Sequence, residues 1–170
     1  MARAAGPGEW VMLTYRMPRD PSTPRSSVWR KLRRLGVAQL GDGLVALPAD
    51  ARTREQLEWI ADEVREADGA AGVWLARPAS QAQERELATE MAAARAAEYQ
   101  AVRVDAEAAM SLGDAERARA VRRLRAELRR IRRRDFFPPF ERDAAVAAVE
   151  LLATSTTVVS GRTDAEVVTS

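Results

Sequence analysis

Residues 9–36 have the sequence EWVMLTYRMPRDPSTPRSSVWRKLRRLG, and this stretch decides the fold. Its first half, from Trp10 to Met17, is apolar and aromatic, as is typical of a β-strand. In a strand, alternate side chains point to opposite faces, so Val11 and Leu13 would share one face. Pro18 cannot donate to a sheet ladder and ends the predicted strand.

The second half of the stretch predicts an amphipathic helix. Thr23 suits the N-cap and Pro24 the first helical position. Gly36 is a natural C-terminal stop. The predicted buried stripe consists of Val28, Trp29, Leu32 and Leu35.

The chain then continues in a pattern that completes a small α+β domain. Two short apolar runs, 37–40 and 44–47, flank Gly41-Asp42-Gly43, which predicts a hairpin. A second helix is expected from Thr53, which forms a capping-box pattern with Gln56. A fourth strand is expected at 73–76. The order strand, helix, strand, strand, helix, strand is that of a ferredoxin-like βαββαβ domain, here predicted at residues 9–78.

Residues 79–153 predict a helical extension packed on that domain, built from a long helical hairpin and a short helix. Residues 80–110 contain neither Gly nor Pro, and Gly113 interrupts the helical pattern. In the next helix, apolar residues recur at spacings of three and four, from Val121 to Ile131. A short helix follows at 141–153. We expect residues 1–8 and 154–170 to be disordered tails.

Composition excludes several kinds of chemistry. The 170 residues include no cysteine and no histidine. Disulfides, Cys/His zinc sites and histidine general bases are therefore absent, and no phosphate-binding loop or carboxylate cluster at metal spacing occurs. The sequence predicts no catalytic residue, no metal site and no cofactor. No secretory signal or membrane-spanning run is present, so we expect no membrane association and a cytoplasmic protein.

Arginine supplies nearly all of the positive charge, since Lys31 is the only lysine. A first basic cluster surrounds the strand-to-helix joint, where helix-start N–H groups and hydroxyls also favour anions. It predicts DNA or oxyanion contact, although a merely solvated helix face would look the same. The candidate residues are Arg16, Arg19, Arg25, Ser26, Ser27, Arg30, Arg33 and Arg34.

A second basic track lies in residues 117–134, where ten of 18 residues are arginine. It could follow a phosphate backbone, and its candidates are Arg122, Arg125, Arg129, Arg130 and Arg133. The alternative is that these arginines are neutralised by acidic residues of the helix before them: Glu84, Glu90, Glu98 and Asp105.

For two further groups of residues, we favour a structural role over a functional one. The segment Asp135–Phe140 holds all three phenylalanines of the chain and predicts a buried aromatic latch that anchors the helical extension. Arg95, Glu98 and Tyr99 predict a polar network beside the sheet, with an anion pocket as the less favoured alternative.

The chain resembles the N-terminal domain of the ChrB chromate-resistance regulators. The resemblance lies in the segments WVMLTYRMPRDPSTPRSSVWRKLRRLG, TREQLEWIADEVREADG, AAARAAEYQ and DFFP. The strand–Pro–Arg–helix joint alone also resembles PaaX-type repressors and ferredoxin-like CRISPR adaptation nucleases. Those nucleases carry an acidic metal ligand at the end of the first strand. Here Tyr15-Arg16-Met17 stands in its place, which disfavours nuclease activity.

The resemblance implies a non-catalytic transcriptional regulator of chromate resistance that binds promoter DNA, responds to chromate or a related oxyanion, and forms a homodimer. Full-length relatives carry a C-terminal chromate-resistance domain that this sequence lacks. We therefore expect a short form that binds without sensing, or that needs a partner protein. The alternative is an oxyanion-binding or protein-interaction module without direct DNA contact.

Overall fold

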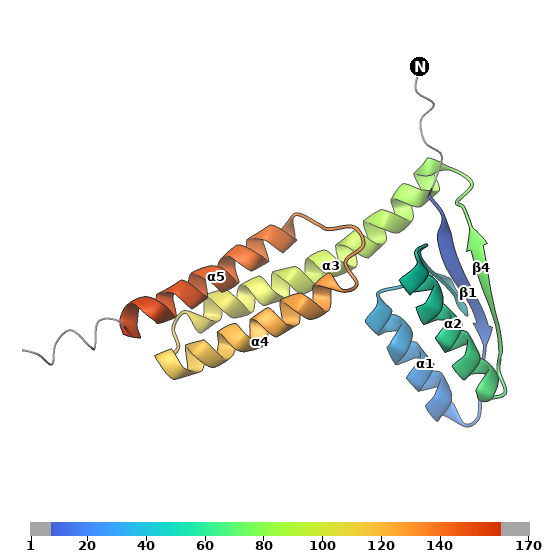
Figure 1. Cartoon of the computed structure of the whole chain (residues 1–170), viewed down its shortest axis with the longest axis horizontal. Coiled ribbons are helices and arrows are strands. Elements are labelled where there is room, and N and C mark those ends of the chain that lie inside the picture. Colours follow the sequence, from blue (N-terminus) through green and yellow to red (C-terminus); the bar gives the residue numbers. More distant parts are fainter. Residues whose placement is uncertain (1–7, 161–170) are drawn as a thin grey trace, which may run out of the picture. The chain divides into compact units, whose positions relative to one another are not determined.

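The computed structural model describes residues 8–160, which form an α+β protein with a four-stranded antiparallel sheet and five helices. The chain divides into two compact units that meet in sequence between Met91 and Ala92. Figure 1 labels the helices of both units and some of the strands of the first. The predicted boundary at residue 78 lies just before a helix that is continuous across the division.

The first unit contains the whole sheet. Its strands are β1 (Trp10–Arg16), β2 (Ala38–Gly41), β3 (Leu44–Pro48) and β4 (Ala70–Ala76). They lie in the order β2-β3-β1-β4, so β1 is central and β2 and β4 are the edges. β1 pairs antiparallel with β3 on one side and with β4 on the other. The predicted hairpin around Gly41-Asp42-Gly43 is confirmed by the pairing of β2 with β3.

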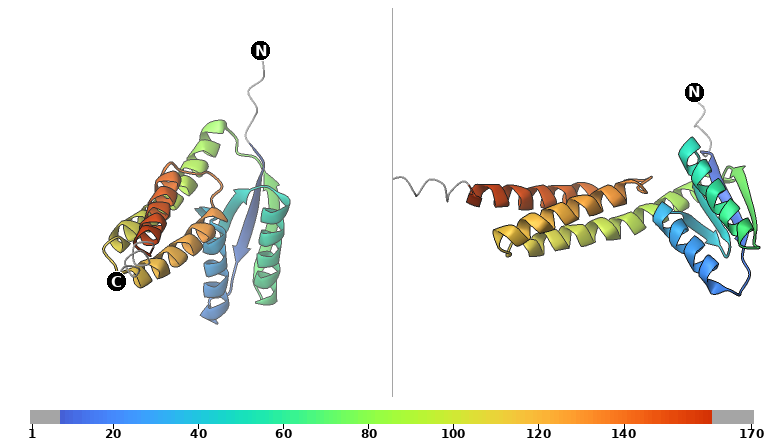
Figure 2. Two further views of the ribbon diagram at one scale, coloured as in Figure 1. Left: turned by 60° about the vertical axis from the view of Figure 1, so that its left-hand side comes forward. Right: turned by 60° about the horizontal axis from the view of Figure 1, so that its bottom comes forward.

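Two helices, α1 (Ser22–Leu35) and α2 (Ala51–Glu66), cover one face of the sheet (Figures 1 and 2). Removing apolar side chains from water on this face drives the packing. The core lies between the layers, and its fully buried side chains include Val11, Leu13, Val28, Leu32, Val45, Leu47, Leu57, Ala61 and Val64.

Both helices of the first unit begin earlier than predicted. α1 starts at Ser22, with Pro21 as a N-cap that offers no side-chain hydrogen bond, so Thr23 and Pro24 lie inside the helix. α2 starts at Ala51 with Asp50 as its N-cap. Thr53 is therefore the third helical residue of a capping box with Asp50, whereas the sequence predicted it as the N-cap partner of Gln56.

Trp29 was wrongly predicted as part of the buried stripe of α1, since 37% of its surface is exposed. Val28, Leu32 and the half-buried Leu35 are spaced four and three residues apart and fill the side of the helix that faces the core. Trp29 follows Val28 directly, about 100° further around the helix, and so lies off that face.

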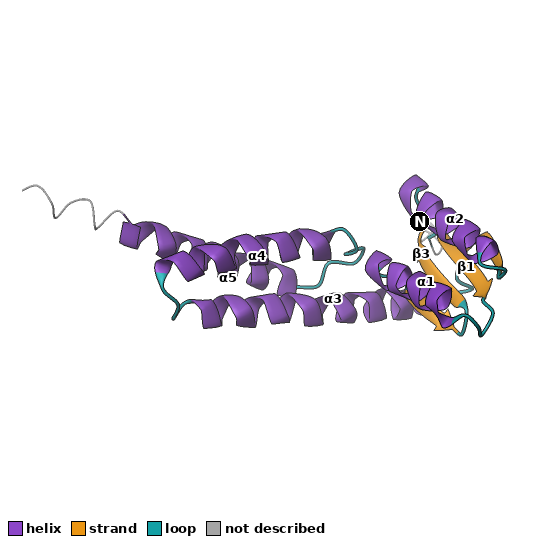
Figure 3. Cartoon of the chain, turned by 90° about the horizontal axis from the view of Figure 1, so that it is seen from below, coloured by secondary structure: helices purple, strands orange, loops and turns teal. Residues whose placement is uncertain are grey.

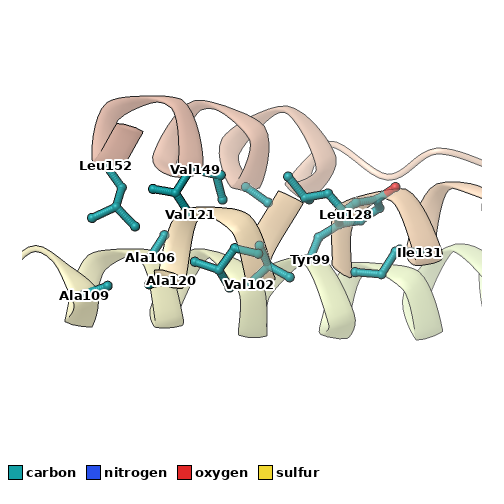
Figure 4. Packing of buried hydrophobic residues seen from close by; sticks show 12 residues of the cluster. Tyr99, Val102, Ala106, Ala109, Ala120, Val121, Leu128, Ile131, Val149 and Leu152 are labelled. Atoms are coloured by element: carbon teal, nitrogen blue, oxygen red, sulfur yellow. The ribbon is translucent and has the colours of Figure 1, made fainter. Parts of the chain in front are cut away.

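The second unit is helical. α3 (Gln81–Ala109) crosses into it, and α4 (Asp114–Arg132) and α5 (Glu141–Ser160) complete it. In this unit the three helices run side by side (Figure 3). Figure 4 shows their shared core. Its buried residues are Tyr99, Val102, Ala106, Ala109, Ala120, Val121, Leu124, Leu128, Ile131, Ala145, Val149 and Leu152.

Two predictions about this unit are wrong. α5 is not a short helix that ends at residue 153 but continues to Ser160. The hydroxyls of Thr154 and Ser155 donate to the carbonyls of Leu151 and Leu152, at 2.9 and 2.8 Å, so these polar residues stay within the helix. The remaining predicted tail residues, 1–7 and 161–170, lie outside the described residues.

The aromatic latch is the other wrong prediction. Phe140 has 83% of its surface exposed, and Phe136 and Phe137 are half-buried. The three phenylalanines therefore do not form one buried cluster.

Within residues 8–160, no helix is both long enough and apolar enough to cross a membrane.

Candidate nucleic-acid interface

Six exposed arginines form what we call the joint surface: Arg16, Arg19, Arg25, Arg30, Arg33 and Arg34. Arg16 ends β1, Arg19 lies in the following turn, and the other four are on α1. Within residues 8–160, none of the six has a carboxylate within 4.0 Å. Lys31, by contrast, pairs with Glu63 at 2.5 Å. The joint surface therefore keeps its full positive charge toward solvent.

The structure divides the joint surface into two groups. Arg30, Arg33 and Arg34 are three and four residues apart on the last turns of α1, where such spacings place side chains on neighbouring positions. Arg16 and Arg25 instead line a shared hollow. Arg19 lies in the turn between β1 and α1, and so between Arg16 and Arg25 in the sequence.

The hollow, which we call the joint pocket, has a volume of about 710 Å³. β1 supplies Tyr15 and Arg16, α1 supplies Arg25, Ser26 and Trp29, and the β2–β3 hairpin supplies Gln39 and Asp42. Residues with two guanidinium groups, two hydroxyls and two aromatic rings thus line one space. Guanidinium groups bind phosphates and other oxyanions in a bidentate manner, and aromatic rings can stack on bases.

Gly43 closes the hairpin against the end of β1. The N–H of Tyr15 donates to the carbonyl oxygen of Gly43 at 2.8 Å. Gly43 has a φ of 70°, and a Cβ there would lie 2.2 Å from the carbonyl oxygen of Tyr15, so only glycine fits. This close approach brings Asp42 next to the Tyr15 phenol. Burial and, to a lesser extent, the charge of Asp42 raise the pKa of Tyr15, which therefore stays protonated as a donor.

The two predicted serines have different surroundings. Ser26 lines the joint pocket. Ser27 instead donates to Glu63 of α2 at 3.3 Å. Because α1 begins at Ser22, both serines lie beyond the first helical turn, so the predicted convergence of these hydroxyls with a helix start does not form.

The basic track of α4 is partly neutralised. Arg125 pairs with Glu150 at 2.8 Å, Arg130 pairs with Glu127, and Arg123 pairs with Asp105 at 3.1 Å. Of the track residues, Arg122 and Arg129 are exposed and have no carboxylate within 4.0 Å in the described part of the chain. Arg133 is exposed at the C-cap of α4.

The predicted neutralisation by the acidic helix involves fewer residues than expected. Asp105 and Glu98 do pair with arginines, at 3.1 Å from Arg123 and 2.9 Å from Arg134. Glu84 instead accepts from the Gly8 N–H and the Trp10 indole. Glu90 makes no ion pair in residues 8–160. Part of the α4 array thus remains free.

Arg95, Glu98 and Tyr99 belong to a buried network in the second unit. Arg95 Nη2 donates to Glu98 at 3.1 Å, and the Tyr99 hydroxyl donates to Asp135 Oδ2 at 2.8 Å. Burial lowers the pKa of Arg95, and burial together with Asp135 raises that of Tyr99. Spacing in the sequence gave no signal for the pairing of Tyr99 with Asp135, because 36 residues separate them. Glu98 of this network also lines a hollow of about 290 Å³, together with Asp105, Arg123 and Arg130.

The joint pocket contains residues that the sequence did not indicate, namely Tyr15, Trp29, Gln39 and Asp42. The Gly-Asp-Gly hairpin was the available signal, because it predicts a tight turn near the strand end. Among the described residues, no group of three or more Asp or Glu side chains could hold a metal ion.

Comparison with known proteins identifies the family. Residues 25–166 match the family model described as "Protein ChrB, N-terminal". The chain is also 31% identical, over 133 residues, to the protein named "Protein ChrB" from Cupriavidus metallidurans strain CH34. That match covers 76% of this chain but 40% of the relative, so the chain spans less than half of that protein. No solved structure matches. The chain belongs to the ChrB family, as a relative of the N-terminal part of ChrB.

Proposed function

We propose that this protein is a non-catalytic, DNA-binding transcriptional regulator of chromate resistance that acts in the cytoplasm on promoter DNA. One observation carries the proposal: six exposed arginines at the end of β1, in the turn after it and along α1 have no acidic partner in the described chain. Such charges release condensed counterions when they contact phosphates, which is the main source of affinity for DNA.

The proposal includes a ferredoxin-like architecture for the first unit. The element order βαββαβ and the strand order, which is β4-β1-β3-β2 when counted from the other edge, support it. This arrangement puts the end of β1, the start of α1 and the β2–β3 turn at one end of the unit, where the joint pocket lies.

Phosphate contacts would come first from the joint surface and second from Arg122 and Arg129 of α4. Arg16 and Arg25 belong both to the joint surface and to the wall of the joint pocket. Contacts to phosphate position a protein on a duplex, whereas base contacts specify the sequence. Gln39 and Trp29, at the same pocket, are the candidates for contact with bases.

A binding assay with a fluorescent duplex from the promoter of the gene's own operon tests the proposal. Arg25→Ala should weaken binding, because it removes an unpaired charge. The matched control is Arg54→Ala on α2 of the same unit, since Arg54 is exposed but is neutralised by Glu58 at 2.8 Å. Equal effects of the two substitutions, or no binding by the wild type at low salt, would contradict the proposal.

A second candidate function is an oxyanion-binding or protein-interaction module without DNA contact. The joint pocket supports it, because Arg16, Arg25 and Ser26 converge there on a space large enough for a tetrahedral oxyanion. Titration with chromate and with sulfate, followed through Trp29 fluorescence in a variant that keeps only this tryptophan, tests it. Loss of the response in Arg25→Ala, together with no DNA binding by the wild type, would favour this alternative.

A further inference from the structure

The two edges of the sheet differ in how well they are protected. β2 is four residues long and has an irregular register between Gln39 and Gly41. Short, bulged edge strands resist pairing with other chains. β4, at the other edge, is seven residues long, pairs regularly with β1 along its whole length, and contains no charged residue and no proline. Within Ala70–Ala76, the edge is protected by one side-chain contact, from Arg65 to Ala71.

The pairing with β1 shows which backbone groups of β4 are free. The N–H of Tyr15 is directed to Gly43, toward β3. Tyr15 is opposite Ala71 in β4. Because the backbone groups of Tyr15 point toward β3, Tyr15 and Ala71 form a non-hydrogen-bonded pair, and the N–H and C=O groups of Ala71 point away from β1. Because the direction alternates along an antiparallel strand, the N–H and C=O groups of Val73 and Leu75 face outward too.

One outward group already has a partner. Arg65 Nη2 of α2 donates to the carbonyl oxygen of Ala71 at 3.1 Å. For the groups of Val73 and Leu75, no hydrogen bond to another element is present in the described chain. The free stretch of the edge is therefore the C-terminal half of β4.

The same half of β4 exposes large apolar side chains on both faces. Trp74 is 59% exposed on one face and Leu75 is 51% exposed on the other. The indole of Trp74 is held in place, since its Nε1 donates to Thr14 Oγ1 at 3.1 Å and the ring lies against Gly72. A partner for this edge must therefore be an extended strand with apolar side chains on both faces.

We propose that β4 is a dimerisation strand: its free edge pairs antiparallel with the same edge of a second copy of this chain. The twofold axis passes beside Trp74. Val73 then forms hydrogen-bonded pairs with Leu75 of the second copy, and the two Trp74 side chains lie opposite each other in a non-hydrogen-bonded pair.

Three observations favour a second copy over a strand of another protein. β4 itself carries apolar side chains on both faces, so a second β4 strand has the properties that a partner for this edge needs. The strand has no charge, so two copies do not repel each other along it. The register centred on Trp74 leaves the contact of Arg65 with Ala71 intact and buries the exposed surfaces of Trp74 and Leu75 in both copies. Aromatic residues placed directly opposite each other stabilise antiparallel pairs.

Sedimentation equilibrium of the full chain, over a roughly hundredfold range of protein concentration, tests the proposal. The wild type should be a dimer. Leu75→Lys should shift the mass to that of the monomer, because a charged side chain on an edge strand opposes pairing with another strand. The matched control is Leu151→Lys on α5, which places the same charge at a residue 63% exposed in the second unit. The control should remain dimeric. A monomeric wild type, or a dimer that Leu75→Lys does not weaken, overturns the proposal.

Cross-linking tests the register independently, because the chain has no cysteine of its own. Opposite residues of a non-hydrogen-bonded pair have Cα atoms about 4.5 Å apart, within the range that a disulfide spans. Trp74→Cys should therefore form a disulfide-linked dimer under mild oxidation. Ala76→Cys should not, since its two copies would be roughly 13 Å apart along the strands. Equal cross-linking of the two variants contradicts the register. This inference does not depend on DNA binding.

Discussion

Asp50 fixes the start of α2 through a reciprocal pair of hydrogen bonds with Thr53. The Thr53 N–H donates to Asp50 Oδ1 at 2.7 Å, and the Asp50 N–H donates to Thr53 Oγ1 at 2.9 Å. Asp50→Ala should lower the free energy of unfolding by about 1 kcal/mol, the usual loss for a helix cap. Urea unfolding of the wild type and the variant measures this change in the free energy of unfolding.

The Asp50 cap also predicts a dependence on pH. The hydrogen bond from the Thr53 backbone lowers the pKa of Asp50. A lowered folded-state pKa means that the stabilisation is present above the ordinary pKa and is lost as the pH falls through the folded-state value. Asp50→Asn retains an accepting oxygen but does not titrate. As the pH falls, the wild type should therefore lose stability relative to Asp50→Asn. A stability difference that does not change with pH would contradict this assignment.

Tyr99 and Asp135 form the polar centre of the second unit. Tyr99 is fully buried, and the Asp135 side chain is 1% exposed. Tyr99→Phe removes the donor to a buried carboxylate, so we expect a loss of about 1.5–3 kcal/mol in the free energy of unfolding. Thermal and urea unfolding check this value. A neutral effect would mean that Arg142, 4.0 Å from Asp135, or water replaces the hydroxyl.

At the residue scale, the sequence could predict side-chain type but not side-chain partner. The arginines of the joint surface stand out by composition, and all six are exposed. Ser27 and Arg130 belong to the same clusters by sequence, yet each faces an acidic side chain, Glu63 and Glu127 respectively. Which cation is neutralised depends on helix rotation and on contacts between elements, and a residue pattern does not contain that information.

At the scale of elements, α4 presents two kinds of arginine on adjacent positions. Arg129 is exposed without a carboxylate partner in residues 8–160, whereas Arg130 pairs with Glu127. If α4 contacts phosphates, Arg129→Ala should weaken DNA binding more than Arg130→Ala. Fluorescence anisotropy with one duplex at fixed low salt makes the comparison. An equal or reversed order would remove α4 from the proposed interface.

The elements themselves could largely be predicted from periodicity. Four strands and both helices of the first unit occur where apolar patterns place them, because burial of one face imposes a repeat on the sequence. The starts of α1 and α2 were wrong by a few residues, since several Ser, Thr, Asp and Pro residues competed for each cap. α5 was predicted too short because hydroxyl side chains suggested a tail, yet Thr154 donates within the helix.

At the scale of the whole molecule, the proposed function depends on free positive charge that is not needed for folding. The joint surface and the unpaired arginines of α4 are exposed, and the buried cores of the two units are made of other residues. Removing one such arginine should therefore leave the fold intact and change only binding. Family membership relates the chain to the N-terminal part of ChrB but does not locate a contact, which must be measured on this chain.

The most direct measurement of that claim is the salt dependence of DNA affinity for the wild type and for Arg30→Ala/Arg34→Ala, with Arg54→Ala/Arg103→Ala as the ion-paired control. We predict a linear fall of log Kobs with log salt concentration for the wild type. Each phosphate-contacting arginine removed should reduce the slope by about 1, so the first variant should lose about 2 and the control almost nothing. A slope that is the same in all three proteins, or no binding at low salt, would contradict the account.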